Sequence, residues 1–222
     1  MVKFPLPNKD SLFIVFIFVP ESNLSCLNCG FNKTSYNITN IIIFPLEKVR
    51  EYMIKISPNG FWKVTLENCF QHYISAEDLI GQNKMYCNSC KGEYDAKTYN
   101  IIYNHPKVLI IILNRGKGIE FNVPFTYPYN FDLNKFINMN NNPNYPNKNK
   151  KIEYELISVI THLGESGMSG HFISCAKSPV DHNWYLYNDA IVSECKDPLN
   201  VFGNATSSSI PYVLFYQLKE NN

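Results

Sequence analysis

Two short cysteine motifs constrain this chain more than any other feature of its sequence. Cys26 and Cys29 form one C-x-x-C pair, Cys87 and Cys90 form a second, and 57 residues lie between the pairs. Thiolates bind zinc tetrahedrally, so two such turns together supply the four ligands of a closed structural site. Because this spacing is longer than in a compact zinc finger, we expect the pairs to sit on two hairpins that are brought together at a tip.

Unligated thiols and a redox pair are the alternative interpretations of these cysteines. A redox C-x-x-C motif does not need a second pair, and the residues between the cysteines include the polar Asn28, Asn88 and Ser89. The total of seven cysteines is odd, which does not suggest a secreted disulfide framework. We therefore expect structural zinc and a reducing compartment, either the cytoplasm or the nucleus.

The composition is that of an ordinary globular protein. Of the 222 residues, 45% are hydrophobic and 18% are charged, enough for one large domain or two small ones. The formal net charge of +1 gives no electrostatic reason to expect nucleic acid or an anionic membrane as a partner. The apolar run Leu12–Val19 is too short to span a bilayer and no small-residue cleavage site follows it, so we interpret it as a buried strand rather than a signal peptide.

Strand-like segments dominate the chain. Each is short, rich in Ile, Val, Phe or Tyr, and bounded by turn-forming residues. The Asn-rich segment Asn138–Lys151 contains two prolines and no apolar period, so we expect a loop between two strands of one sheet. The predicted strands are Leu12–Val19, Ile38–Phe44, Val108–Leu113, Tyr154–Ile160, His171–Ala176, Trp184–Asn188 and Tyr212–Gln217.

Two helices are predicted in the middle of the chain. The first covers Thr65–Tyr73, where Thr65 and Asn68 can cap the first turn. The second covers Ser75–Ile80, which begins with the pattern of a capping box. The first helix has the stronger support because its apolar residues share one face at helical spacing: Leu66, Cys69, Phe70 and Tyr73.

The histidine with the most informative surroundings is His171. A cysteine protease needs a thiolate, an imidazole within hydrogen-bond reach, and a polar group that orients the imidazole. His171 begins a predicted strand after the glycine-rich segment Gly164–Gly170, and Asn188 and Asp189 end the next predicted strand. Antiparallel pairing would bring an amide or a carboxylate beside the ring. The alternative is a structural histidine after a mobile loop. A phosphate-binding loop has weak support, because the lysine and the strand-to-helix context are absent.

The order of these motifs resembles the C-terminal two-thirds of a ubiquitin-specific protease catalytic domain. The resemblance covers nearly everything after about residue 20. Its specificity is high because separate blocks keep both their order and their approximate spacing. Phe172 departs from the pattern, since the family often has Tyr there. The matching blocks are residues 26–29, 65–70, 84–90, 105–115, 154–172, 184–189 and 211–216.

The resemblance implies an α+β fold, with a papain-like protease palm of mostly antiparallel sheet, β fingers tipped by zinc, and no thumb. Residues 1–222 would form a single incomplete domain, with fingers at about 11–45 and 84–104 and the palm at 46–83 and 105–222. The implied activity is deubiquitination, the thiol-dependent hydrolysis of the bond after the C-terminal glycine of ubiquitin. The implied partners are ubiquitin or ubiquitinated proteins.

The resemblance also assigns roles to individual residues. His171 would be the general base, Asn188 would orient it, and Asp189 would be an auxiliary polar residue beside them. The zinc ligands would be the four paired cysteines. The narrow channel for the glycine tail of ubiquitin would be formed by Gly167, Ser169 and Gly170.

The nucleophilic cysteine of the family has no counterpart here, because no cysteine precedes Cys26. Cys69 reads as a core residue, and Cys195 falls in a loop. Cys175 is four residues after His171 on the same predicted strand, about 13 Å away and too far for proton transfer. We therefore expect this chain alone to be inactive. It is either a deubiquitinase truncated or split at its N-terminus or a catalytically dead ubiquitin-binding pseudo-protease, with an unrelated zinc-stabilised interaction domain as the remaining alternative.

Overall fold

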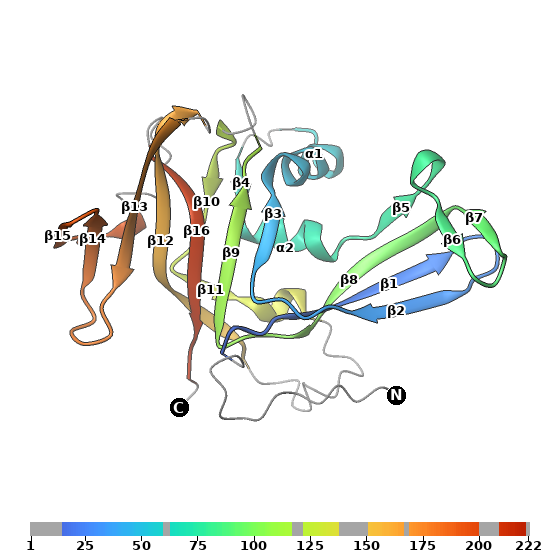
Figure 1. Cartoon of the computed structure of the whole chain (residues 1–222), viewed down its shortest axis with the longest axis horizontal. Helices are drawn as coiled ribbons and strands as arrows, with labels where there is room; N and C mark the ends of the chain where they lie inside the picture. The colour runs from blue at the N-terminus through green and yellow to red at the C-terminus, as the bar shows by residue number, and fades with distance from the viewer. Residues whose placement is uncertain are drawn as a thin grey trace.

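A broad twisted sheet with a long arm projecting from one side makes up the molecule (Figure 1). The computed structural model describes residues 15–59, 63–116, 122–137, 151–166, 169–199 and 209–220. The central sheet has eight strands, and all of its pairings are antiparallel except β3 with β9. In spatial order the strands are β15 (Ile191–Glu194), β14 (Trp184–Asn188), β13 (Ser169–Lys177), β12 (Glu153–Ser166), β16 (Ser209–Leu218), β9 (Val108–Asn114) and β3 (Ile42–Pro45), and β11 (Asn130–Asp132) also pairs with β12.

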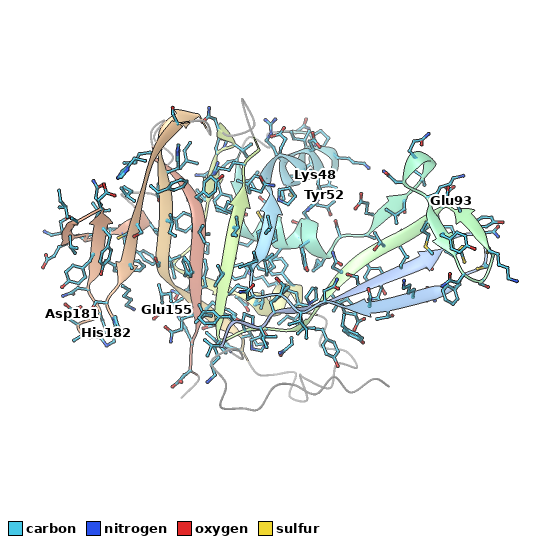
Figure 2. The ribbon with its side chains drawn as sticks, in the orientation of Figure 1. Lys48, Tyr52, Glu93, Glu155, Asp181 and His182 are labelled. Atoms are coloured by element: carbon cyan, nitrogen blue, oxygen red, sulfur yellow. The ribbon has the colours of Figure 1, made fainter. Side chains whose placement is uncertain are left out.

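The arm is a second antiparallel sheet with a small hairpin at its far end (Figure 1). Its strands, in spatial order, are β2 (Asn32–Tyr36), β1 (Val19–Cys26), β8 (Ala96–Asn104) and β5 (Glu77–Leu79). The hairpin consists of β6 (Met85–Cys87) and β7 (Gly92–Tyr94), with the 3₁₀ turn η2 (Gly81–Asn83) before it. Figure 2 shows Glu93 at this end of the arm.

Two helices lie between the central sheet and the arm, α1 (Leu46–Ile56) and α2 (Leu66–Ile74) (Figure 1). The short parallel pair β4 (Val64–Thr65) and β10 (Phe125–Thr126) leads into α2, and η4 (Leu133–Phe136) packs nearby. None of the helices in the described ranges is long and apolar enough to cross a membrane. The core joins these elements through aromatic contacts, since Phe70 of α2 lies 5.0 Å from both Phe44 of β3 and Phe131 of β11, measured between ring centroids.

The predicted start of α2 is confirmed. The Asn68 backbone N–H donates to Oγ1 of Thr65 at 3.2 Å, and the Thr65 N–H donates to Oδ1 of Asn68 at 3.0 Å. This reciprocal pair satisfies two backbone donors that a helix start leaves without partners. The helix predicted over Ser75–Ile80 is wrong, because Glu77–Leu79 is the edge strand β5 and pairs with β8. That segment has a capping pattern but no apolar face, so pairing along the arm decides its structure.

Two other segments differ from expectation. The strand predicted over Leu12–Val19 is wrong in most of its described part, because Phe18 makes only an isolated bridge and regular pairing begins at Val19; residues 12–14 lie outside the described residues. Helix α1 was not predicted, although Leu46, Val49 and Met53 are buried on one face at helical spacing. Pro45 precedes α1 and provides no side-chain cap, so the usual start signal is absent.

The segment Asn138–Lys151 was predicted to connect two strands of one sheet. Its residues 138–150 lie outside the described residues. On its two sides, β11 and β12 pair directly, with Phe131 opposite Tyr154. Both strands therefore belong to the same sheet, in agreement with the expectation.

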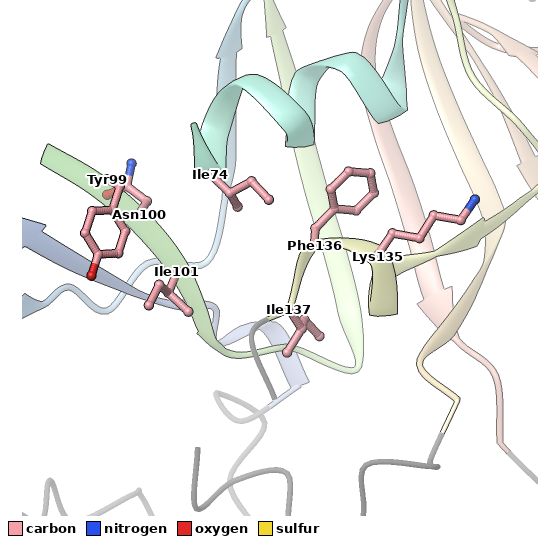
Figure 3. A pocket seen from close by; sticks show the side chains of 7 residues that line it. All are labelled: Ile74, Tyr99, Asn100, Ile101, Lys135, Phe136 and Ile137. Carbon is pink, nitrogen blue, oxygen red and sulfur yellow. The ribbon is translucent and has the colours of Figure 1, made fainter. Parts of the chain in front are cut away.

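A small pocket lies where the arm meets the body of the protein (Figure 3). Its volume is about 270 Å³, and its lining comes from the end of α2, from β8 and from η4. The lining is mainly apolar, with Lys135 and Asn100 as its polar members. The seven lining residues are Ile74, Tyr99, Asn100, Ile101, Lys135, Phe136 and Ile137.

A buried arginine joins three segments at one end of the central sheet. Arg115, just after β9, is only 2% exposed. Its Nε–H donates to the Pro211 carbonyl at 2.9 Å, and its Nη1 donates to the Val123 carbonyl at 2.8 Å. Burial lowers the pKa of Arg115 to about 10. The side chain therefore connects the ends of β9 and β16 with the segment that enters β10.

We expect Arg115→Ala to lower the free energy of unfolding by about 3 kcal/mol, because two buried carbonyls lose their donors. The matched control is Arg50→Ala, which removes an ion pair with Glu47 on the surface of α1 and should cost less than about 1 kcal/mol. Urea denaturation of the two variants measures the difference. Equal destabilisation by both substitutions would contradict the structural role given to Arg115.

Candidate functional site

The four paired cysteines converge at the far end of the arm. Cys26 ends β1 and Cys87 ends β6, and each is followed by the turn that contains the second cysteine of its pair. The two turns have the same backbone geometry. The Gly30 N–H donates to the Cys26 carbonyl at 2.9 Å, and the Lys91 N–H donates to the Cys87 carbonyl at 2.8 Å. The two turns therefore present their thiols toward each other from neighbouring hairpins.

The residue after the second cysteine completes each of these turns. Gly30 has a φ of +71° and Lys91 has a φ of +55°, both in the left-handed region. Glycine adopts this region without strain, whereas a residue with a Cβ adopts it less readily. The sequence contained this signal at Gly30, next to Cys29, but Lys91 carries no corresponding signal.

The spacing of the four sulfur atoms suits a tetrahedral ion. The Cys26 and Cys90 sulfurs are 4.0 Å apart, the Cys29 and Cys87 sulfurs are 3.7 Å apart, and all four lie within 4.8 Å of one another. Zinc–sulfur bonds of about 2.3 Å in a tetrahedron put sulfurs about 3.8 Å apart. The four cysteines can therefore hold a metal ion.

Hydrogen bonds to sulfur support the thiolate form at this cluster. The Phe31 backbone N–H bonds to the Cys29 sulfur and is the main cause that lowers the pKa of Cys29 to about 6. The Asn28 amide donates to the Cys90 sulfur at 3.4 Å and lowers its pKa, but hydrogen bonds with the other three cysteines together with burial outweigh this effect and raise the pKa of Cys90 to about 12. Metal binding requires deprotonated thiols, so the contacts with Phe31 and Asn28 favour the ligand form, whereas the neighbouring sulfurs oppose it at Cys90.

His171 and Asn188 meet across the strands β13 and β14. These strands are antiparallel neighbours, with Ser174 opposite Tyr187. Nε2 of His171 lies 2.7 Å from Oδ1 of Asn188. A carbonyl oxygen only accepts, so Nε2 carries the proton in this hydrogen bond. Nδ1 of the neutral ring is then left with its lone pair, as an acceptor for a proton from another group.

Asp189 lies beside this pair but is more exposed. One of its carboxylate oxygens, Oδ2, is 3.7 Å from Nε2 of His171, and its side chain is 80% exposed, against 44% for His171. Asp189 begins the two-residue turn between β14 and β15 and has a φ of +51°, a conformation that Asp tolerates better than most residues. Its carboxylate adds electrostatic attraction once the imidazole is protonated, weakened by the surrounding water.

The turn at the other end of β13 and β14 fixes how these strands pair. Figure 2 shows Asp181 and His182 in this turn. The hydroxyl of Tyr185 donates to Oδ2 of Asp181 at 2.6 Å, and the Asn183 N–H donates to Oδ1 at 3.1 Å. The Tyr185 hydrogen bond is the main cause that lowers the pKa of Asp181 to about 2. The Asp181 carboxylate therefore accepts hydrogen bonds both from within the turn that joins β13 to β14 and from β14 itself.

The three residues suggested for the ubiquitin tail are only partly described. Gly167 lies outside the described residues. Ser169 and Gly170 are exposed at the start of β13, and Ser169 pairs with Ser166 across the hairpin. Gly170 has a packing constraint of its own, because a Cβ at this position would lie 2.2 Å from Nε2 of His162. His162 received no role from the sequence, although the glycines around it were noted.

The three remaining cysteines are buried away from the His171–Asn188 pair. Cys69 on α2 and Cys175 on β13 are fully buried, and Cys195 is 6% exposed. Cys175 is four residues along β13 from His171, a separation of about 13 Å. The Cys195 N–H donates to the carbonyl of Trp184, which lies at the opposite end of β14 from Asn188, again about 13 Å away along the strand.

Known proteins resemble this chain over most of its length. The sequence model of the family "Ubiquitin carboxyl-terminal hydrolase" matches residues 7–216. Ubiquitin carboxyl-terminal hydrolase 2 of Gallus gallus is 27% identical over 210 residues, which are 92% of this chain and 52% of that protein. Ubiquitin carboxyl-terminal hydrolase 17-like protein B of Mus musculus is 28% identical over 201 residues, 88% of this chain and 36% of that protein. The chain thus spans about half or less of these relatives.

The fold agrees with a solved structure as well. A chain of the SAGA Ubp8/Sgf11/Sus1/Sgf73 DUB module bound to ubiquitin aldehyde matches with a TM-score of 0.70 and 21% sequence identity. The match covers 99% of this chain and 45% of that chain. The expected α+β fold, mostly antiparallel sheet with a cysteine-tipped arm, is confirmed. Because the family model covers nearly the whole sequence, this chain belongs to the ubiquitin carboxyl-terminal hydrolase family, of the ubiquitin-specific protease type that its motifs resemble.

Proposed function

We propose that this chain contributes the general base of a cysteine-type deubiquitinase, which hydrolyses the bond after the C-terminal glycine of ubiquitin. The observation that carries the proposal is the 2.7 Å contact between Nε2 of His171 and Oδ1 of Asn188. With Nε2–H donating to Asn188, the Nδ1 lone pair can accept a proton from a thiol, and the ring lies in the orientation that this transfer needs. Membership of the hydrolase family supports the same chemistry.

In this reaction Nδ1 of His171 takes the proton of a thiol, and the thiolate attacks the carbonyl carbon of the terminal glycine. The C–N bond of the tetrahedral intermediate then breaks, and the imidazolium gives its proton to the departing amine. Water attacks the resulting thioester while Nδ1 accepts one of its protons, and the C–S bond then breaks to release the thiolate and the ubiquitin carboxylic acid. The acid loses the second proton to solvent and leaves as the carboxylate. Asn188 accepts from Nε2–H throughout, and Asp189 adds attraction to the charged ring.

We also propose that Gly167, Ser169 and Gly170 border the channel for the ubiquitin tail. The tail ends in two glycines, so a narrow channel that is rich in backbone excludes larger residues. Ser169 and Gly170 are exposed immediately before His171, which agrees with such a position.

The nucleophilic thiol, in this proposal, does not come from residues 1–222. All seven cysteines are described: four form the cluster on the arm and three are buried in the core. The same distribution favours the second candidate function, a catalytically dead protein that binds ubiquitin. The transcript upstream of Met1 separates the two candidates, since an in-frame cysteine block indicates an active parent enzyme and a stop codon indicates a pseudo-protease.

Zinc is the proposed ion at the arm, with a structural role. Cys26, Cys29, Cys87 and Cys90 would hold it, and four thiolates leave no coordination position open for water or substrate. The seven unpaired thiols also agree with a location in the cytoplasm or the nucleus.

We expect the purified chain to bind ubiquitin without hydrolysing its conjugates. Titration of ¹⁵N-labelled ubiquitin should shift resonances of its C-terminal tail, and ubiquitin without its two terminal glycines should bind more weakly. Turnover of a fluorogenic ubiquitin amide should be the same for the wild-type chain and for His171→Ala. Turnover that depends on His171 would disprove the absence of a nucleophile, and lack of any ubiquitin binding would disprove the proposed function of this chain.

We expect the chain to contain one zinc ion, and Cys87→Ser to lose it. Elemental analysis measures the zinc content, and hydrogen exchange should rise in the β6–β7 hairpin and the turn after β1, because metal binding is coupled to local folding. Cys69→Ala is the matched control, since it removes a buried thiol outside the cluster and should keep the zinc. Full zinc content in Cys87→Ser would contradict the assignment of the four ligands.

A further inference from the structure

A second histidine packs directly against the backbone that carries His171. His162 is on β12, opposite Phe172 on β13, and the next pair in the register is Leu163 with His171. Its side chain faces inward, with the residue 5% exposed. Removal from water lowers its pKa, which favours the neutral ring.

The ring occupies space that two glycines leave open. A Cβ at Gly170 would lie 2.2 Å from Nε2 and 2.3 Å from Cε1 of His162. A Cβ at Gly164 would lie 2.8 Å from Cε1 of the same ring. Real Cβ atoms essentially never approach this closely, so the imidazole lies directly against the backbone at both positions.

An aromatic pair bounds the ring on another side. Phe172 meets His162 edge to face, with 4.9 Å between the ring centroids. Tyr212 on β16 meets Phe172 in the same manner at 5.4 Å. Phe172 is 52% exposed, so its position depends on these two ring contacts more than on burial in the core.

The two contacts of His162 flank His171 in the sequence. Gly170 precedes His171 and Phe172 follows it, so one ring contacts the backbone before the proposed base and the side chain after it. Glycine has the greatest backbone freedom of any residue, and the ring takes that freedom away at Gly170. The orientation of the His171 side chain follows from its backbone, because rotamer preference depends on φ and ψ.

We propose that His162 is a positioning residue, whose ring fixes residues 170–172 so that Nε2 of His171 meets Asn188. This inference rests on the proposed function, in which His171 is the general base. It also gives Gly170 two roles. Its lack of a side chain leaves room for the His162 ring on the inner side, and its backbone borders the proposed channel for the ubiquitin tail. The shape of the ring matters here, and its proton chemistry does not.

The experiment measures the tautomer of His171 by NMR in the chain labelled with ¹⁵N-histidine. The chain has five histidines, and His171→Gln identifies the resonances of His171 by their loss. In the wild type we expect His171 to be mainly the Nε2–H tautomer. In His162→Ala we expect that preference to be lost, and in His162→Phe, which keeps a flat ring, we expect it to be retained.

The matched control is His72→Ala. His72 is half-buried on α2, its ring lies 5.3 Å from that of Tyr52, and burial lowers its pKa as it does for His162. This variant removes an equivalent packed ring away from β12 and β13, and we expect the His171 tautomer to stay unchanged. A loss in His162→Ala alone therefore reports positioning rather than general loosening of the fold.

Each of the remaining outcomes also tests the inference about His162. A folded His162→Ala chain with the wild-type His171 tautomer would overturn the inference. If His162→Ala does not fold, His162→Phe decides, since an altered His171 in a folded Phe variant overturns the inference and an unaltered one supports it. A wild-type His171 without an Nε2–H preference would count instead against the His171–Asn188 pair, and so against the proposed function itself.

Discussion

The pairing register of β12, β13 and β14 is the constraint on which the proposed catalytic geometry depends. Side chains alternate between the two faces of a sheet, so a slip of one residue would move His171 to the opposite face. Val159 and Cys175 are paired and fully buried, which makes such a slip costly. The Asp181–Tyr185 hydrogen bond lies at the turn that joins β13 to β14. The register of these strands is therefore supported by the buried Val159–Cys175 pair in the core and by this hydrogen bond at the surface.

The arm is stabilised differently, because it has almost no hydrophobic core at its end. Strand β2 is largely exposed along its length. The buried residues among the described part of this end are Cys26, Cys87 and Ala96. A segment that buries so little apolar surface does not offset the entropy of ordering its backbone. An ion held by the four thiols would supply that missing stability, and it would account for the presence of cysteines rather than large apolar side chains in this interior.

Sequence patterns correctly predicted those helices and strands for which the local sequence signal and the burial in the fold favour the same structure. The start of α2 at Thr65 and the bounds of β14 match the predictions, because capping residues or apolar runs there coincide with burial. The predictions were wrong where strand pairing outweighs the local sequence pattern. Leu12–Val19 is apolar, yet regular pairing begins at Val19 and continues through the polar residues of β1. The short strand β5 forms because β8 offers it an edge, and no property of its own sequence indicates this.

The His171–Asn188 hydrogen bond is too weak to hold the site together by itself. It is partly exposed to water, which competes for both partners, so its net contribution is small. Its geometry must therefore be imposed by its surroundings: the register beneath it, and the ring of His162 against Gly170 beside it. None of these restraints requires a nucleophilic thiol. In the proposed function, His171 would therefore be oriented without a nucleophile present, and a thiol within reach of Nδ1 would meet a proton acceptor already in place.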